Sequence, residues 1–139
     1  MVDALEAVRR ALAPRGWVFD LQPDATYLPT VAVRDSRGRR SIGAIDREPD
    51  EDVIAAHGVR ERVVREGRFE QVASLRRTYI TRFTSLSSFD ADRRSHTPVW
   101  RLARGVRPRL IEAWRARRDG AVIETTRRMT IAVLRKRVG

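Results

Sequence analysis

Apolar positions recur at helical spacing in the last third of the chain, and we predict one long amphipathic helix over residues 98–118. Thr97 is a suitable cap and Pro98 a suitable first residue for this helix. One side of its helical wheel carries Val99, Leu102, Ala103, Val106, Leu110, Ala113 and Trp114. Pro108 removes a backbone donor, so it should kink the helix or divide it near Gly105.

Short runs rich in β-branched and aromatic residues predict the strands. Two of these runs enclose the turn-forming residues 35–39, a spacing typical of a β-hairpin. The run Trp17-Val18-Phe19 is expected to enter the core as a strand. The remaining predicted strands cover residues 27–34, 41–45, 78–84, 121–123 and 129–134.

Three further segments complete the pattern. Residues 3–13 predict a first helix, and a short helix should begin after Pro49 and end at Gly58. The stretch 59–72 fits either a helix or a hairpin, and we favour the hairpin. Residues 85–95 are polar and rich in serine and aspartate, which is typical of a surface loop.

This order of elements predicts a single α+β domain over residues 1–139 with a mostly antiparallel sheet. We expect the N-terminal helix and the long helix of the last third to pack on that sheet, with a final strand at the C-terminus. The chain has 42% hydrophobic residues, which is enough for a core and argues against wholesale disorder.

The apolar runs are short, and none approaches the roughly 18 residues that cross a bilayer. Acids at Asp3 and Glu6 stand where a signal peptide carries bases. We therefore expect no membrane segment and no cleaved leader.

The net charge of +11 is almost entirely due to arginine, because Lys136 is the only lysine. Residues 98–139 hold 12 basic and three acidic residues, and therefore most of the excess. Two sets of arginines are candidate contacts for phosphate groups or for acidic surfaces of a partner, although each also fits a solvated surface. They are Arg101, Arg104, Arg107, Arg115 and Arg118 on the predicted helix, and Arg37, Arg39 and Arg40 at the predicted hairpin tip.

Catalytic motifs are missing from the sequence. There is no cysteine, and the two histidines, His57 and His96, are far apart in sequence, which argues against a shared metal site. A metal-dependent nuclease site could be built from Asp35 and Asp46, but such sites usually add a lysine on the same sheet. No glycine-rich phosphate loop or nucleophile elbow occurs. We therefore expect no enzyme activity, no metal, no cofactor and no small-molecule substrate.

The order of elements resembles that of tail terminator and related tail-completion proteins of long-tailed phages. The resemblance rests on a helix like 3–13, a proline-bearing strand like 27–33, a hairpin, a strand like 78–84, and a helix like 99–117 before a final strand. It implies a structural, ring-forming subunit at the head-to-tail junction, without catalytic residues. The expected partners are copies of the chain and neighbouring virion proteins, and the expected location is the virion or the host cytoplasm.

A second hypothesis comes from the charge. The arginines of the predicted helix 98–118 could follow the phosphate backbone of a nucleic acid. This makes an arginine-rich nucleic-acid-binding module the alternative function, and both hypotheses could hold if a ring encircles DNA.

Overall fold

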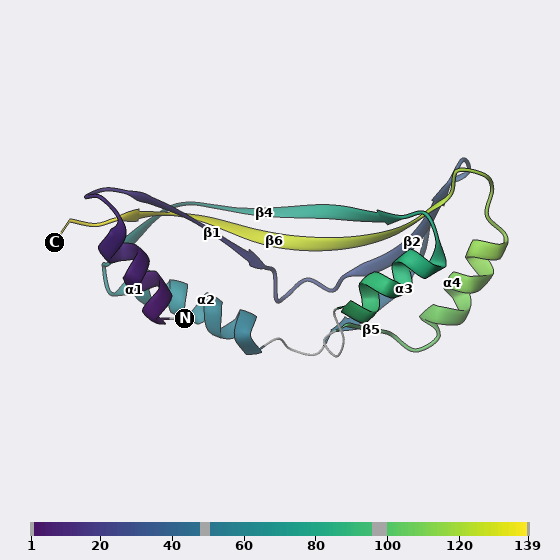
Figure 1. Cartoon of the computed structure of the whole chain (residues 1–139), viewed down its shortest axis with the longest axis horizontal. Coiled ribbons are helices and arrows are strands. Elements are labelled where there is room, and N and C mark those ends of the chain that lie inside the picture. Colours follow the sequence, from purple (N-terminus) through teal and green to yellow (C-terminus); the bar gives the residue numbers. More distant parts are fainter. Residues whose placement is uncertain (1, 48–50, 96–99, 139) are drawn as a thin grey trace. The chain divides into compact units, whose positions relative to one another are not determined.

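The computed structural model describes residues 2–47, 51–95 and 100–138, in which four helices and six strands form an α+β protein (Figure 1). In chain order the elements are α1 (Val2–Ala11), β1 (Trp17–Pro23), β2 (Thr30–Asp35), β3 (Gly38–Arg47), α2 (Glu51–Arg65), β4 (Phe69–Phe83), α3 (Leu86–Ser95), β5 (Trp100–Leu102), α4 (Val106–Arg115) and β6 (Val122–Lys136). The strands form an antiparallel sheet in the order β1-β6-β2-β3-β5, and β4 also pairs with β6. None of the described helices is long and apolar enough to cross a membrane.

Residue contacts divide the chain into two compact units. Unit 1 comprises Met1–Ala25, Glu51–Arg77 and Met129–Gly139, and unit 2 comprises Thr26–Asp50 and Thr78–Arg128. The long strands β4 and β6 contribute one part to each unit. The prediction that the whole chain is one domain stays a prediction.

Unit 1 contains α1, α2, β1 and the C-terminal part of β6. β1 pairs with β6 in a register that runs from Trp17 opposite Arg135 to Pro23 opposite Met129. Successive side chains of a strand point to opposite faces, so every second residue faces the helices. The core on that face contains Val63, Phe69, Ala132 and Leu134, with Leu5, Leu12, Val18 and Val64 packed around it.

Unit 2 contains the β2–β3 hairpin, β5, the first part of β6 and the helices α3 and α4. β2 lies between β3 and β6, and β5 pairs with the end of β3. Phe83 and Phe89 meet edge to face with their ring centres 5.6 Å apart. The core beneath α3 and α4 contains Val31, Val33, Ile42, Ile45, Phe83, Phe89, Val106, Leu110, Ala113, Trp114 and Ile123.

The predicted architecture is wrong in its principal element, the long helix over 98–118. The described part of that segment is the short strand β5 followed by α4, a helix of ten residues. Gly105 precedes α4 with a φ of 77°, a left-handed conformation that stops any helix from running through it. Pro108 then lies in the first turn of α4, where a backbone donor is not needed. Thr97 and Pro98, the predicted helix start, lie outside the described residues.

Two other segments also differ from the prediction. The helix α2 does not end at Gly58 but continues to Arg65, so the hairpin favoured over 59–72 is wrong. Buried Val59 and Val63 supply the packing that carries the helix past the glycine. Residues 86–95 form the helix α3 instead of a surface loop.

The start of α3 has a local cause. The Ser85 hydroxyl oxygen accepts a hydrogen bond of 3.0 Å from the backbone N–H of Ser88, which caps the first turn. One turn further on, Phe89 is buried in the core of unit 2 and holds the helix on the sheet. The capping serine and the buried phenylalanine turn a polar sequence into a helix.

Candidate functional site

The arginines predicted to share one helix face come from different elements. Arg101 lies in β5, Arg104 in the turn that follows, Arg107 and Arg115 on α4, and Arg118 beyond that helix. Arg107 forms an ion pair with Asp90 of α3, with Nη2 2.7 Å from Oδ2. The hydrogen bond from Arg107 lowers the pKa of Asp90 more than burial raises it. This pair joins the two helices of unit 2, and a role of the five arginines in binding a partner stays a prediction.

Of the three arginines predicted at the hairpin tip, Arg37 lies in the turn between β2 and β3, whereas Arg39 and Arg40 lie within β3, opposite Arg34 and Val33 of β2. Asp35 accepts backbone hydrogen bonds from Arg37 at 2.8 Å and from Arg118 at 3.2 Å. These two N–H groups lower the pKa of Asp35. The structure therefore brings the hairpin and Arg118 together, although they are about eighty residues apart in sequence.

Three arginines of unit 2 converge on one carboxylate. Glu124 lies on β6 and is 0% exposed. Its Oε1 accepts hydrogen bonds from Nε of Arg34 on β2 at 2.8 Å and from Nε of Arg82 on β4 at 3.1 Å. Its Oε2 accepts one from Nε of Arg39 on β3 at 3.2 Å. We call Glu124 and these three arginines the basic face.

The charge of the basic face follows from these bonds. Burial raises the pKa of Glu124, but the hydrogen bonds and charges of Arg34 and Arg82 outweigh it, so the net pKa lies below the ordinary range. Glu124 is therefore ionised at neutral pH and compensates one of three guanidinium charges. On β2, Ala32 and Arg34 alternate with Val31 and Val33, which face the core. Ala32 is opposite Glu124 on β6. Glu124 and Arg34 therefore lie on the sheet face away from the helices.

Sequence reasoning named only Arg39 of this cluster. The four side chains come from four strands and meet only through strand pairing, which the sequence does not reveal. The available signal was Glu124 itself, because an acid inside a run of apolar and β-branched residues needs a partner.

Unit 1 exposes apolar side chains on the sheet face opposite its helices. Trp17, Phe19 and Leu21 alternate along β1 and are 49%, 67% and 58% exposed. Across the strand pair, Phe19 lies opposite Val133 and Leu21 opposite Ile131, so these five residues share one surface. We call it the apolar face. The expectation that Trp17 and Phe19 enter the core is wrong, because only Val18 of that run points towards it.

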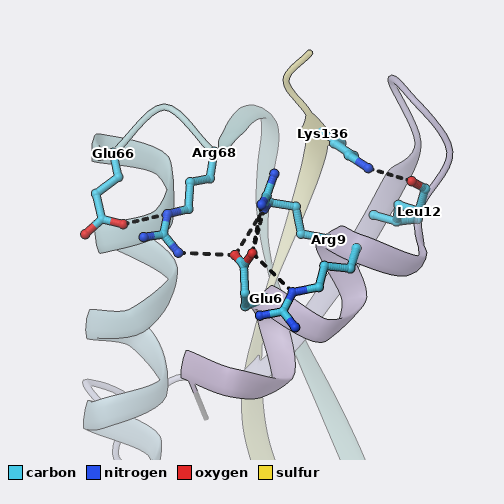
Figure 2. A network of polar contacts seen from close by, with 7 residues as sticks. Glu6, Arg9, Leu12, Glu66, Arg68 and Lys136 are labelled. Atoms are coloured by element: carbon cyan, nitrogen blue, oxygen red, sulfur yellow. Dashed lines mark hydrogen bonds and ion pairs between the residues drawn. The ribbon is translucent and has the colours of Figure 1, made fainter. Parts of the chain in front are cut away.

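A polar network holds the N-terminal helix of unit 1 in place (Figure 2). Glu6 accepts hydrogen bonds from Arg9 at 2.8 Å, within α1, and from Arg68 at 3.1 Å, beside the start of β4. Arg68 also pairs with Glu66 at 2.9 Å. Lys136 donates to the carbonyl of Leu12 at 2.7 Å, which links β6 to the end of the same helix. These contacts have a structural role.

Two of the residues considered for metal chemistry, Asp35 and His57, have other partners. Nδ1 of His57 lies 2.8 Å from Nη2 of Arg60, and its Nε2 lies 3.1 Å from the carbonyl of Pro23. His96 lies outside the described residues. Within residues 2–47, 51–95 and 100–138, no group of three or more acidic or histidine side chains is placed to hold a metal ion.

The described residues thus offer two candidate surfaces, the apolar face of unit 1 and the basic face of unit 2. The first suits contact with an apolar partner surface, and the second suits contact with an anion. Compared with models of protein families, with curated proteins and with solved structures, the chain matches none of them.

Proposed function

We propose that the protein is a structural subunit that associates with copies of itself through the apolar face of unit 1. The observation that carries this proposal is the row of exposed Trp17, Phe19 and Leu21 on β1. An antiparallel sheet with one face on a core normally presents polar side chains on the other face. Here the second face is apolar as well, which is the pattern of a sheet covered on both sides.

The size of the exposed side chains supports a specific contact. A fully covered aromatic side chain buries about 150–250 Å², and about half of Trp17 and two thirds of Phe19 are still uncovered and available for such burial. Ile131 and Val133 continue the same surface on the neighbouring strand. Contiguous apolar surface of this kind marks an interaction site in soluble proteins.

The occupant we propose is a second copy of the chain. A chain with a net charge of +11 repels its own copies over most of its surface, so they can approach only where local charge is low. Arg135, at the rim of the apolar face, is already paired with Glu70 at 2.7 Å. Two such faces related by a two-fold axis would pack as stacked sheets, about 10 Å apart.

β1 adds a second reason for association. It lies at one end of the strand order and pairs with β6 alone among the described strands. An edge strand with an apolar face is prone to uncontrolled pairing unless something covers it. A defined contact between copies removes this hazard.

The particular assembly we propose is the head-to-tail junction of a long-tailed phage, where this subunit would contact its copies and neighbouring virion proteins. That narrower proposal rests on the resemblance in the order of elements. In that order of elements, the helix expected over residues 99–117 corresponds in the structure to the ten-residue α4, which the short strand β5 precedes. The described residues from Trp100 onwards form β5 and the ten-residue α4 and not one continuous helix, so nucleic-acid binding by such a helix is excluded.

The location of the contact can be tested by charge substitution. Phe19→Glu introduces a carboxylate at the centre of the apolar face, and we expect oligomers to dissociate to monomers by size-exclusion chromatography with light scattering. Ile54→Glu is the matched control, since Ile54 is 52% exposed on α2, away from the apolar face. It should leave the oligomer unchanged. Equal behaviour of the two variants would refute the proposed contact.

A further inference from the structure

The three arginines of the basic face have unused hydrogen-bonding capacity. A guanidinium carries five N–H donors, and each of these arginines gives only its Nε–H to Glu124. Within the described part of the chain, Arg34, Arg39 and Arg82 donate to no other acceptor. Their side chains are partly exposed, so the terminal nitrogens are available to a ligand from solvent.

The cluster also has more positive charge than Glu124 requires. One arginine is enough to pair with a buried carboxylate, because the guanidinium and the carboxylate match in a two-pronged contact. Arg34 and Arg39 are directly opposite each other on β2 and β3, a position where like charges repel. A bound anion would relieve this repulsion, whereas Glu124 alone leaves two positive charges uncompensated.

The neighbouring positions on this face carry hydroxyl groups. Thr126 follows Glu124 by two residues on β6, and Thr30 lies opposite it on β2, so both share the face of Glu124. The hydroxyls of Thr30 and Thr126 are hydrogen-bonded to each other, and the Tyr27 hydroxyl donates to Thr126 at 3.1 Å. Thr126 is buried, whereas Tyr27 and Thr30 are half-buried, so these two hydroxyls can join the arginines in contacts of the kind made to a sugar–phosphate backbone.

We propose that the basic face of unit 2 binds the phosphate backbone of a nucleic acid without reading its base sequence. Guanidinium groups anchored through Nε present their remaining donors in a rigid fork that matches two phosphate oxygens. The three guanidinium groups come from three strands of one sheet and their side chains are partly exposed, which suits a polymer with repeated phosphates. The net charge of +11 attracts such a polyanion from a distance. This site goes beyond the proposed self-association and lies in the other unit.

The test is a salt titration of binding to fluorescent oligonucleotides of random sequence, both duplex and single-stranded, by anisotropy. The wild-type chain should bind with an affinity that falls steeply between about 50 and 200 mM salt. Arg34→Gln with Arg82→Gln should weaken binding by about tenfold or more and reduce the log–log salt slope by about 1–2. Arg39 remains in this variant to pair with Glu124, so the buried carboxylate keeps a partner.

The matched control is Arg62→Gln with Arg65→Gln on the exposed surface of α2, which removes the same charge from unit 1. It should change the affinity by less than about twofold. Circular dichroism and sizing accompany each variant. If the double variant at the basic face unfolds, Arg82→Gln alone takes its place with an expected loss of about threefold.

Three results would overturn the proposal. The first is an equal loss of affinity in both pairs of variants, which would mean that only net charge matters. The second is a wild-type chain that does not bind either oligonucleotide at low salt. The third is an oligoglutamate peptide that binds through Arg34 and Arg82 more tightly than DNA of equal charge, which would make the face a protein-docking site. Sizing of the same variants reports on self-association separately, so either proposal can fail without the other.

Discussion

At the scale of single residues, Glu124 shows how a carboxylate is kept inside a strand. It has no solvent exposure, and its charge is stabilised by three guanidinium groups from three other strands. A buried ion pair of this kind contributes little compared with an apolar residue, but removing one side of it leaves the other uncompensated. Loss of Glu124 should therefore lower the free energy of unfolding by more than any single one of its contacts contributes.

We expect Glu124→Ala to lower the free energy of unfolding by about 2–4 kcal/mol, because it leaves a cavity and three mutually repelling arginines. Glu61→Ala on the exposed side of α2 should change it by no more than about 0.5 kcal/mol. Urea denaturation at neutral pH measures both. A Glu124→Ala variant as stable as the control would show that the carboxylate is not needed to hold the arginines.

Glu6 predicts a dependence of stability on pH. Hydrogen bonds from Arg9, assisted by the charges of Arg9 and Arg68, lower its pKa from 4.5 to about 2 against the opposing effect of burial. A carboxyl group with a lowered pKa in the folded state stabilises the protein above its unfolded pKa. This stabilisation is complete above about pH 4.5 and is lost as the pH falls towards about 2.

The variant Glu6→Gln isolates this effect. Its free energy of unfolding should be lower than that of the wild type at pH 7, and the difference should shrink as the pH falls from about 4.5 to about 2. Denaturant titrations at several pH values give the difference directly. A gap between the two proteins that stays constant over this range would show that ionisation of Glu6 does not contribute.

At the scale of elements, the packing of α4 on β3 depends on one glycine. A methyl group on Gly43 would lie 2.6 Å from Cγ2 of Val106, the buried first residue of α4. Side chains in a packed core cannot yield by so much without shifting the helix. The close approach of this helix to the sheet therefore requires glycine at position 43.

We expect Gly43→Ala to destabilise the protein by about 1–3 kcal/mol. Gly58→Ala in α2 provides the opposite case, because nothing lies within 4 Å of the added methyl group. Alanine favours a helix, so that variant should gain about 0.5–1 kcal/mol. Thermal and urea unfolding of the two variants measure whether Gly43→Ala loses stability and Gly58→Ala gains it. A Gly43→Ala variant with undiminished stability would contradict the close helix–sheet contact.

The elements that the sequence predicts well are those with a local signal. The helix expected over 3–13 is α1, and the hairpin around 35–39 has its turn where predicted. The helix over 98–118 fails because periodicity alone does not show where a helix begins. Gly105, where the sequence indicates a kink or a division, is the residue before α4, and Pro108 lies in the first turn of that helix.

The candidate surfaces were harder to predict than the elements. The basic face joins residues from four strands, and its members become neighbours only through the register of the sheet. The apolar face was missed because Trp17 and Phe19 look like core residues in sequence. Apolar residues alternating in a strand indicate a covered face, but they do not tell whether the cover comes from the same chain or from another.

At the scale of the whole molecule, each unit has helices on one sheet face and an open face on the other side. The open face of unit 1 is apolar, and that of unit 2 carries the three arginines around Glu124. The proposed self-association and the proposed polyanion binding therefore involve different surfaces.

The central claim is that copies of the chain associate through the apolar face, and sedimentation velocity over a range of protein concentrations tests it most directly. High salt should favour association, because it screens repulsion between chains of net charge +11 and leaves apolar contact intact. We predict a species at least twice the monomer mass, which dissociates on dilution and is absent in Phe19→Glu. A wild-type chain that sediments as a monomer at every concentration, in both low and high salt, would contradict the account.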